Sequence, residues 1–114
     1  MKSDSITQKI EAMYPDTTEQ FKAMMSEMYM TFCMKMDDYG ANNIALGRDL
    51  SVADNKRMSL MGIWFRSNDK MARIENLIKR EGEAPSNEPL RDSYLDLANY
   101  CIIASIVDKN LWGK

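Results

Sequence analysis

Three carboxylates recur at every fourth position near the end of the chain. Glu88, Asp92 and Asp96 therefore lie along one face of a helix over two turns. Like charges at this spacing repel one another, so a metal ion, facing Arg or Lys groups, or solvent must offset the repulsion. Mg²⁺ prefers such oxygen ligands and would imply a phosphate-bearing ligand, whereas a solvated helix N-terminus is the alternative interpretation. Asp96 differs from the other two because Leu residues flank it, so we expect it to be buried beside a cation.

A basic face precedes these acids in the sequence. Arg66, Lys70 and Arg73 are separated by four and three residues, and Asp69 lies beside them. Guanidinium and ammonium groups so arranged can bind phosphate oxygens. The same groups could instead form an ordinary charged surface, or neutralise the later acids without any ligand.

A third polar group surrounds the sequence Asp-Tyr-Gly. Lys35, Asp38, Tyr39 and Asn43 lie within nine residues of one another. Acidic residues are unfavourable at a helix C-terminus, so their presence there indicates a site or a nearby lysine partner. Tyr39 is suited to stacking on a base, and Asn43 to contacting the hydrogen-bonding edge of that base.

The elements that must position these residues are predicted to be helices. Apolar residues recur at helical spacing, and strand-like alternation is absent. Thr17 or Thr18 is expected to cap the second helix, Ser51 or Asp54 the third, and Ser86 or Asn87 the fourth. Positive φ at Gly40 is expected to end the second helix. The four predicted helices span residues 3–13, 19–38, 53 or 58 to 80, and 88–106, with a long connection at 41–56 and a linker at 81–87.

Composition limits the class of protein. The chain has 114 residues, of which 45% are hydrophobic and 28% charged, and its net charge is −2. We therefore expect one all-α domain over residues 1–114, with its core at 19–107 and no strong attraction to nucleic acid. No apolar run approaches the ~20 residues that span a bilayer, and no secretory signal is evident, so we expect a cytoplasmic protein. Because histidine is absent, histidine metal sites and histidine-based triads are excluded.

Four residue types bear on packing and assembly. Cys33 and Cys101 lie in predicted helices, and we expect buried thiols rather than a disulfide. Six of the eleven methionines crowd residues 24–36, which is consistent with core filling or with a subunit interface, and we expect a homo-oligomer. Gly62, inside a helix, suggests a close backbone approach, and Trp112 is expected to fold back or to meet another subunit.

Taken together, these motifs resemble a known family. Asp-Tyr-Gly at 38–40, R-x-x-D-K-x-x-R at 66–73 and E-x-x-R-D-x-x-x-D-L-A-N-Y at 88–100 resemble the first type of nucleotide-modification-associated domain. Those small all-helical proteins, common in phages, look distantly similar to MazG-like nucleoside triphosphate pyrophosphohydrolases. The resemblance spans about residues 21–107, and it implies a bundle of about four helices that acts on or binds nucleotides. The chain departs from the MazG-like pattern because its second helix lacks the paired glutamates.

The resemblance and the residues together give two main hypotheses. In the first, the protein hydrolyses a nucleoside triphosphate or a related phosphoanhydride with Mg²⁺. Asp92 and Asp96 would be catalytic in that case, and Glu88, Asp92, Asp96 and Asp69 would hold the metal. The predicted substrate-binding residues are Lys35, Asp38, Tyr39, Asn43, Arg66, Lys70 and Arg73.

In the second hypothesis, the protein is a non-catalytic phage binder that sequesters a nucleotide signal or blocks a host protein. That protein would need the basic and aromatic groups but not the carboxylates. A purely structural module, in which the acids and bases form internal ion pairs, is the third hypothesis.

Overall fold

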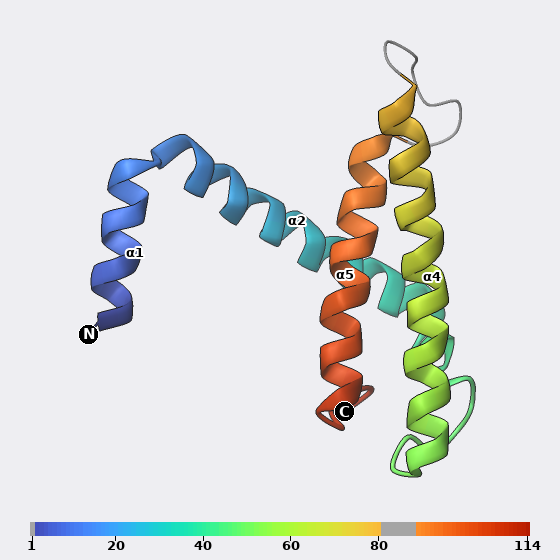
Figure 1. Cartoon of the computed structure of the whole chain (residues 1–114). Helices are drawn as coiled ribbons and strands as arrows, with labels where there is room; N and C mark the ends of the chain where they lie inside the picture. Colours follow the sequence, from blue (N-terminus) through green and yellow to red (C-terminus); the bar gives the residue numbers. More distant parts are fainter. Residues whose placement is uncertain (1, 81–88) are drawn as a thin grey trace. The chain divides into compact units, whose positions relative to one another are not determined.

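Every regular element in the described part of the chain is an α-helix. The computed structural model describes residues 2–80 and 89–114, and within these ranges it contains five helices (Figure 1). This confirms the all-α class, with one short helix more than the four expected. The helices are α1 (Lys2–Met13), α2 (Pro15–Tyr39), α3 (Asn42–Ala45), α4 (Ala53–Lys79) and α5 (Leu90–Asp108). None of the helices in the described ranges is both long and apolar enough to cross a membrane.

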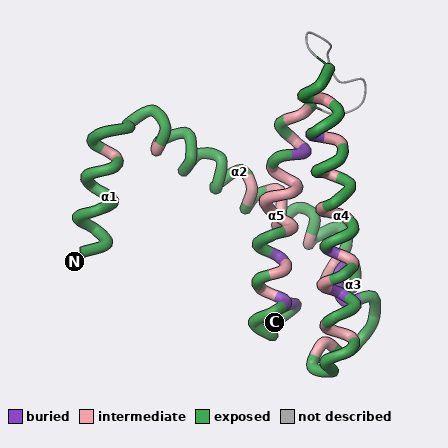
Figure 2. The backbone as a smooth tube through the Cα atoms, viewed as in Figure 1, coloured by how far each residue is buried: buried purple, intermediate pink, exposed green. Residues whose placement is uncertain are grey.

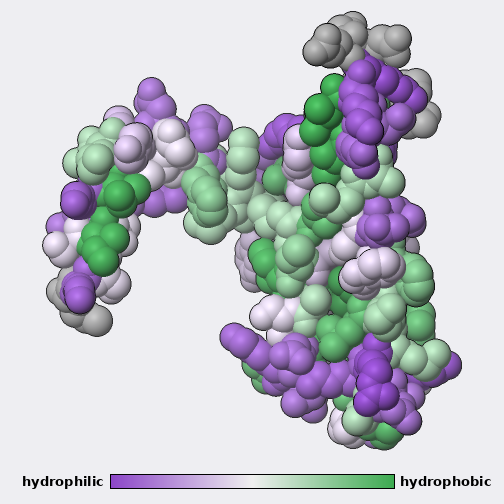
Figure 3. All heavy atoms as spheres, viewed as in Figure 1, coloured by the Kyte–Doolittle hydropathy of each residue, from purple (hydrophilic) through white to green (hydrophobic). Residues whose placement is uncertain are grey.

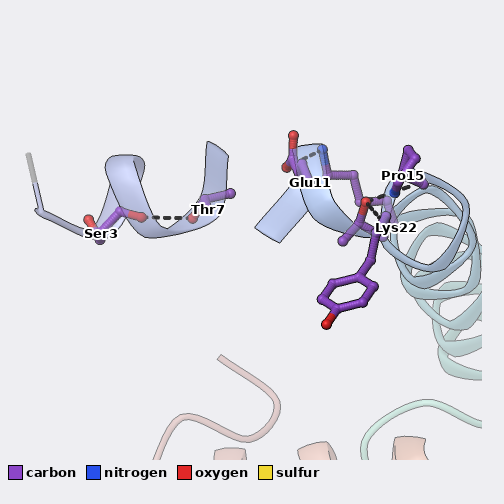
Figure 4. Close-up of polar contacts among 7 residues, drawn as sticks. Ser3, Thr7, Glu11, Pro15 and Lys22 are labelled. Atoms are coloured by element: carbon purple, nitrogen blue, oxygen red, sulfur yellow. Dashed lines mark hydrogen bonds and ion pairs between the residues drawn. The ribbon is translucent and has the colours of Figure 1, made fainter. Parts of the chain in front are cut away.

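Contacts divide the chain into two units, Met1–Met34 and Lys35–Lys114, and the single-domain expectation stays a prediction. In the first unit, α2 begins at Pro15 rather than at Glu19, so the predicted threonine cap is wrong. Proline suits a first helical position because its φ is already helical and it has no N–H to leave unpaired. Thr18 instead donates its hydroxyl to the Tyr14 carbonyl over 2.9 Å. Figure 4 shows Lys22 reaching back across this junction to Glu11, with 2.8 Å between Nζ and Oε1.

The second unit is built on α4 and α5, which lie side by side and run in opposite directions (Figure 1). The short α3 packs on α4, where the buried Ser59 donates its hydroxyl to the Ile44 carbonyl over 2.9 Å. Lys56, near the start of α4, donates to the carbonyl of Asp108 over 2.7 Å. It thereby satisfies one of the carbonyls that a helix C-terminus leaves unpaired. The buried apolar residues, marked in Figure 2, are Ile44, Ala45, Ile63, Ile74, Ile103, Val107 and Trp112.

The connection between α2 and α4 is only partly as predicted. Gly40 adopts φ +68°, and its N–H donates to the Met36 carbonyl, so α2 ends as expected. The start of α4 differs from the prediction, because no side chain caps it. Asp49 instead accepts bonds from both the backbone N–H and the hydroxyl of Ser51, which is a local turn.

The structure also tests the expectations for Trp112, for Gly62 and for the two cysteines. Trp112 folds back onto its own chain, because the ring is buried and its Nε1 donates to the Ala41 carbonyl over 3.0 Å. The expected close approach at Gly62 is wrong, since a Cβ there would meet nothing within 4 Å. Cys33 and Cys101 are free, as predicted, but both are exposed rather than buried. The predicted linker at 81–87, including the Ser86 or Asn87 cap, lies outside the described residues.

Candidate functional site

Asp96 joins three helices of the second unit through its side chain. Its Oδ2 lies 2.9 Å from Nζ of Lys70 on α4, and its Oδ1 lies 3.2 Å from Nζ of Lys35 near the end of α2. The Asp96 side chain is 16% exposed and that of Lys70 is 20% exposed, whereas that of Lys35 is 52% exposed. The expected cationic partner of Asp96 is thus present twice. We call Lys35, Lys70 and Asp96 the lysine–aspartate cluster.

The protonation of Asp96 follows from this arrangement. Burial raises the pKa of the Asp96 carboxyl, since desolvation penalises its charged form. Hydrogen bonds from Lys70 and Lys35, together with their positive charges, lower it, and the net pKa lies below the ordinary value of 3.8. Asp96 is therefore a carboxylate at neutral pH, and both of its oxygens are engaged.

One turn further along α4, Arg73 contacts a residue that sequence reasoning missed. Its Nη1 donates to the hydroxyl oxygen of Ser93, over 2.5 Å, and Ser93 is fully buried on α5. Ser93 and Asp96 are three residues apart, as are Lys70 and Arg73, so matching faces of α4 and α5 meet in two successive polar contacts. The only feature of the sequence that pointed to this role of Ser93 is its position, three residues before an aspartate that was expected to be buried.

The remaining predicted substrate-binding residues lie around the start of α3. Arg66 on α4 donates through Nη2 to the Asn43 backbone carbonyl over 3.0 Å, and to its Oδ1 over 3.4 Å. Asp38 and Tyr39 are exposed at the end of α2, and the Tyr39 side chain is 64% exposed. Tyr39 lies four residues after Lys35, so the two share a helix face.

The carboxylates predicted to hold a metal are not gathered within the described residues. Asp92 is half-buried on α5, Asp69 is exposed on α4, and Glu88 lies outside the described residues. Over residues 2–80 and 89–114, no three Asp, Glu or Cys side chains are grouped so that they could hold a metal ion. The described residues thus do not by themselves fit Mg²⁺, and a metal site that includes Glu88 stays a prediction.

A cavity of about 390 Å³ lies elsewhere in the second unit. It is bordered by the segment after α3 and by the residues that follow α5, with Arg48, Asp49 and Trp112 among its walls. None of the residues predicted to form the site lines this cavity. It is therefore a rival location for a small ligand.

The geometry around Asp96 favours binding of an anion over proton transfer. A carboxylate held by two ammonium groups is a poor base, since its pKa is already depressed. The lysine–aspartate cluster carries one net positive charge. Arg73 adds a positive charge within one turn of α4, and the half-buried Asp92 adds a negative one within one turn of α5. Asp96 holds the two lysines close together against their mutual repulsion.

Comparison with known proteins adds a family. The sequence model of nucleotide modification associated domain 1 matches residues 35–107. This range includes the lysine–aspartate cluster and every other predicted site residue. No curated protein and no solved structure matches the chain.

Proposed function

Because the chain belongs to the nucleotide modification associated domain 1 family, we propose that it binds a phosphorylated nucleotide at the lysine–aspartate cluster. The observation that carries the proposal is the pair of ammonium groups held on one carboxylate, 2.9 and 3.2 Å from its oxygens. Phosphate oxygens would replace solvent on the exposed side of Lys35, and Lys70 would keep its bond to Asp96. The protein would act in the cytoplasm, where nucleotides are abundant.

The base would lie toward the end of α2. Tyr39 follows Lys35 by one helical turn and exposes its ring, and stacking of a base on an aromatic ring contributes about 1–3 kcal/mol. Asn43 lies four residues beyond Tyr39. Its carbonyl groups accept bonds from Arg66, which leaves its amide N–H groups for the base edge.

Titration calorimetry tests the proposal with nucleoside mono-, di- and triphosphates, and with a nucleoside that has no phosphate. We expect binding of the phosphorylated compounds alone. Lys35→Gln should weaken it roughly ten- to a hundredfold, since a hydrogen bond to a charged group is worth about 1.5–3 kcal/mol. Lys79→Gln is the matched control, because Lys79 is an exposed lysine of α4 paired with Glu75. Equal effects of the two substitutions would contradict the proposal.

A second variant pair tests the position of the base. Tyr39→Ala should weaken binding of a nucleotide but not of inorganic pyrophosphate, because pyrophosphate has no base to stack. Tyr94→Ala, which removes an exposed tyrosine from α5, should leave both affinities unchanged. Loss of pyrophosphate binding in Tyr39→Ala would contradict the assignment of Tyr39 to the base.

Mg²⁺-assisted hydrolysis of a phosphoanhydride is the second candidate function. Asp92 and Asp96 favour it, because they lie one turn apart on α5 and both are at least half-buried. When bound there, Mg²⁺ would supply positive charge for the phosphates and an activated water. Asp96 must then exchange a lysine for the metal, so we place this candidate second. Turnover of a triphosphate that needs Mg²⁺ and is abolished in Asp92→Asn would favour it; binding without turnover would favour a sequestering protein.

A further inference from the structure

The cavity of about 390 Å³ in the second unit has a size at which proteins bind small molecules. Ligand pockets hold about 300–1,000 Å³, so this cavity lies near the lower end of the range. None of the residues of the proposed nucleotide site lines it. Hydrophilic residues gather at the surface at the C-terminal end of α5, at the bottom of the view in Figure 3. The cavity therefore suits a ligand that is smaller than a nucleoside triphosphate.

Both walls of the cavity are held in place by hydrogen bonds and close packing. On one wall, Trp112 donates to the Ala41 carbonyl over 3.0 Å, and a Cβ added at Gly113 would lie 3.1 Å from the Ala41 Cβ. On the other wall, the Asp49 carbonyl accepts a bond from the side-chain amide of Asn55 over 3.0 Å. The cavity is thus formed before a ligand arrives, which lowers the entropic cost of binding.

Arg48 supplies a positive charge at the cavity wall. Within residues 2–80 and 89–114 it forms no ion pair, and its guanidinium donates to the thioether sulfur of Met58. A thioether is a weak acceptor, so this bond orients the guanidinium without neutralising it. The charge of Arg48 and its other N–H donors therefore remain available to an anionic ligand.

Asp49 also lines the cavity, but its carboxylate already has partners. Its Oδ1 accepts bonds from the hydroxyl of Ser51 over 2.7 Å and from the Ser51 N–H over 2.9 Å. These bonds lower the pKa of the Asp49 carboxyl, and the positive charge of Lys114 lowers it further. Asp49 is therefore ionised at neutral pH, and its charge repels an anion more strongly the more charge that anion carries.

These charges favour a singly charged anion. A phosphate monoester carries about −1.5 to −2 at neutral pH, whereas a carboxylate carries a single negative charge. A carboxylate also matches the planar fork of a guanidinium with two parallel hydrogen bonds. The buried Ala45, Val107 and Trp112 provide apolar surface for the rest of the ligand.

We propose that this cavity binds a small organic carboxylate, with its charged group on Arg48 and its apolar body against Trp112, Val107 and Ala45. The proposal does not depend on the nucleotide site, because the two sites share no residue. Either proposal can therefore fail while the other stands.

NMR of the full chain tests the proposal with benzoate, with the uncharged benzamide and with phenyl phosphate. We expect millimolar benzoate to shift the amide signals of Arg48 and Asp49 and the indole N–H signal of Trp112. Benzamide should bind there about tenfold more weakly or less, since a hydrogen bond to a charged group is lost. Phenyl phosphate should also bind there more weakly than benzoate. Unshifted signals with benzoate, equal binding of benzamide, or tighter binding of phenyl phosphate at these residues would overturn the proposal.

A pair of arginine variants tests the residue assigned to the charged group. Arg48→Gln should weaken benzoate binding about tenfold or more. Arg57→Gln is the matched control, because Arg57 is an exposed arginine that pairs with Asp54 and does not line the cavity. Unchanged affinity in Arg48→Gln, or an equal loss in both variants, would overturn the proposal. The comparison of benzoate with benzamide needs no variant, so it keeps the proposal testable if Arg48→Gln disturbs folding.

Discussion

Replacing Asp96 by asparagine tests whether the lysine–aspartate cluster stabilises the second unit. The change keeps the shape of the side chain and removes the charge that binds Lys70 at 2.9 Å and Lys35 at 3.2 Å. Breaking a fully buried pair costs about 3–5 kcal/mol, and an exposed pair is worth about 0–1 kcal/mol. The Lys70 pair lies between these limits, since both side chains are about one-fifth exposed or less, and the Lys35 pair lies near the lower one. We expect Asp96→Asn to lower the free energy of unfolding by about 2 kcal/mol at pH 7, or about 8 °C in Tm.

The loss should depend on pH in a defined direction. The pKa of Asp96 is lower in the folded protein than its ordinary value of 3.8. Its stabilisation is therefore fully present above the pKa of the unfolded chain and is lost as pH falls through the folded pKa. The difference in stability between parent and variant should be constant from about pH 7 to pH 5 and should shrink below about pH 4.

Thermal unfolding followed by circular dichroism measures this difference across the pH range. Asp69→Asn is the matched control, because Asp69 is an exposed aspartate next to Lys70 on α4, and its replacement should cost less than about 0.5 kcal/mol. Equal destabilisation by the two changes, or a loss in Asp96→Asn that does not vary with pH, would refute the reasoning.

Three further substitutions test other parts of the second unit by urea unfolding. Gly62→Ala should raise the free energy of unfolding by about 1 kcal/mol, because a helical glycine is replaced where a Cβ meets nothing within 4 Å; no gain would show that the space is occupied. Trp112→Phe should lower it by about 1 kcal/mol, since the bond to the Ala41 carbonyl is lost; an unchanged value would contradict that bond. Ser93→Ala should cost about 1–3 kcal/mol because the buried hydroxyl bonded by Arg73 disappears; a stabilised variant would contradict this contact.

The predictions from the sequence were correct where a single local rule determines the structure. The apolar stripe of α4 predicted its extent closely, and Gly40 marked the end of α2 because only a residue tolerant of positive φ fits there. The cationic partner of Asp96 was also predictable, because a charge between two leucines cannot remain buried alone. Which two lysines would supply it depended on tertiary packing.

Most of the incorrect predictions concern features that contacts between helices determine. Helix α3 has four residues, and its main support is packing on α4, which no local pattern reports. The buried Ser93 depends on Arg73 of another helix in the same way. Exposure of Cys33 and Cys101 was missed because an apolar helix was expected to be covered. For α2, the start was placed too late because a threonine was expected to cap the helix, whereas Pro15 is its first helical residue.

Mapping a bound nucleotide on the chain by NMR tests the central claim most directly. Backbone amide signals would be compared with a nucleoside triphosphate added and with the corresponding nucleoside added. We predict that the triphosphate shifts the signals of Lys35, Lys70 and Asp96 and that the nucleoside leaves them in place. Shifts confined to residues around Arg48 and Trp112, which border the 390 Å³ cavity, would contradict the account.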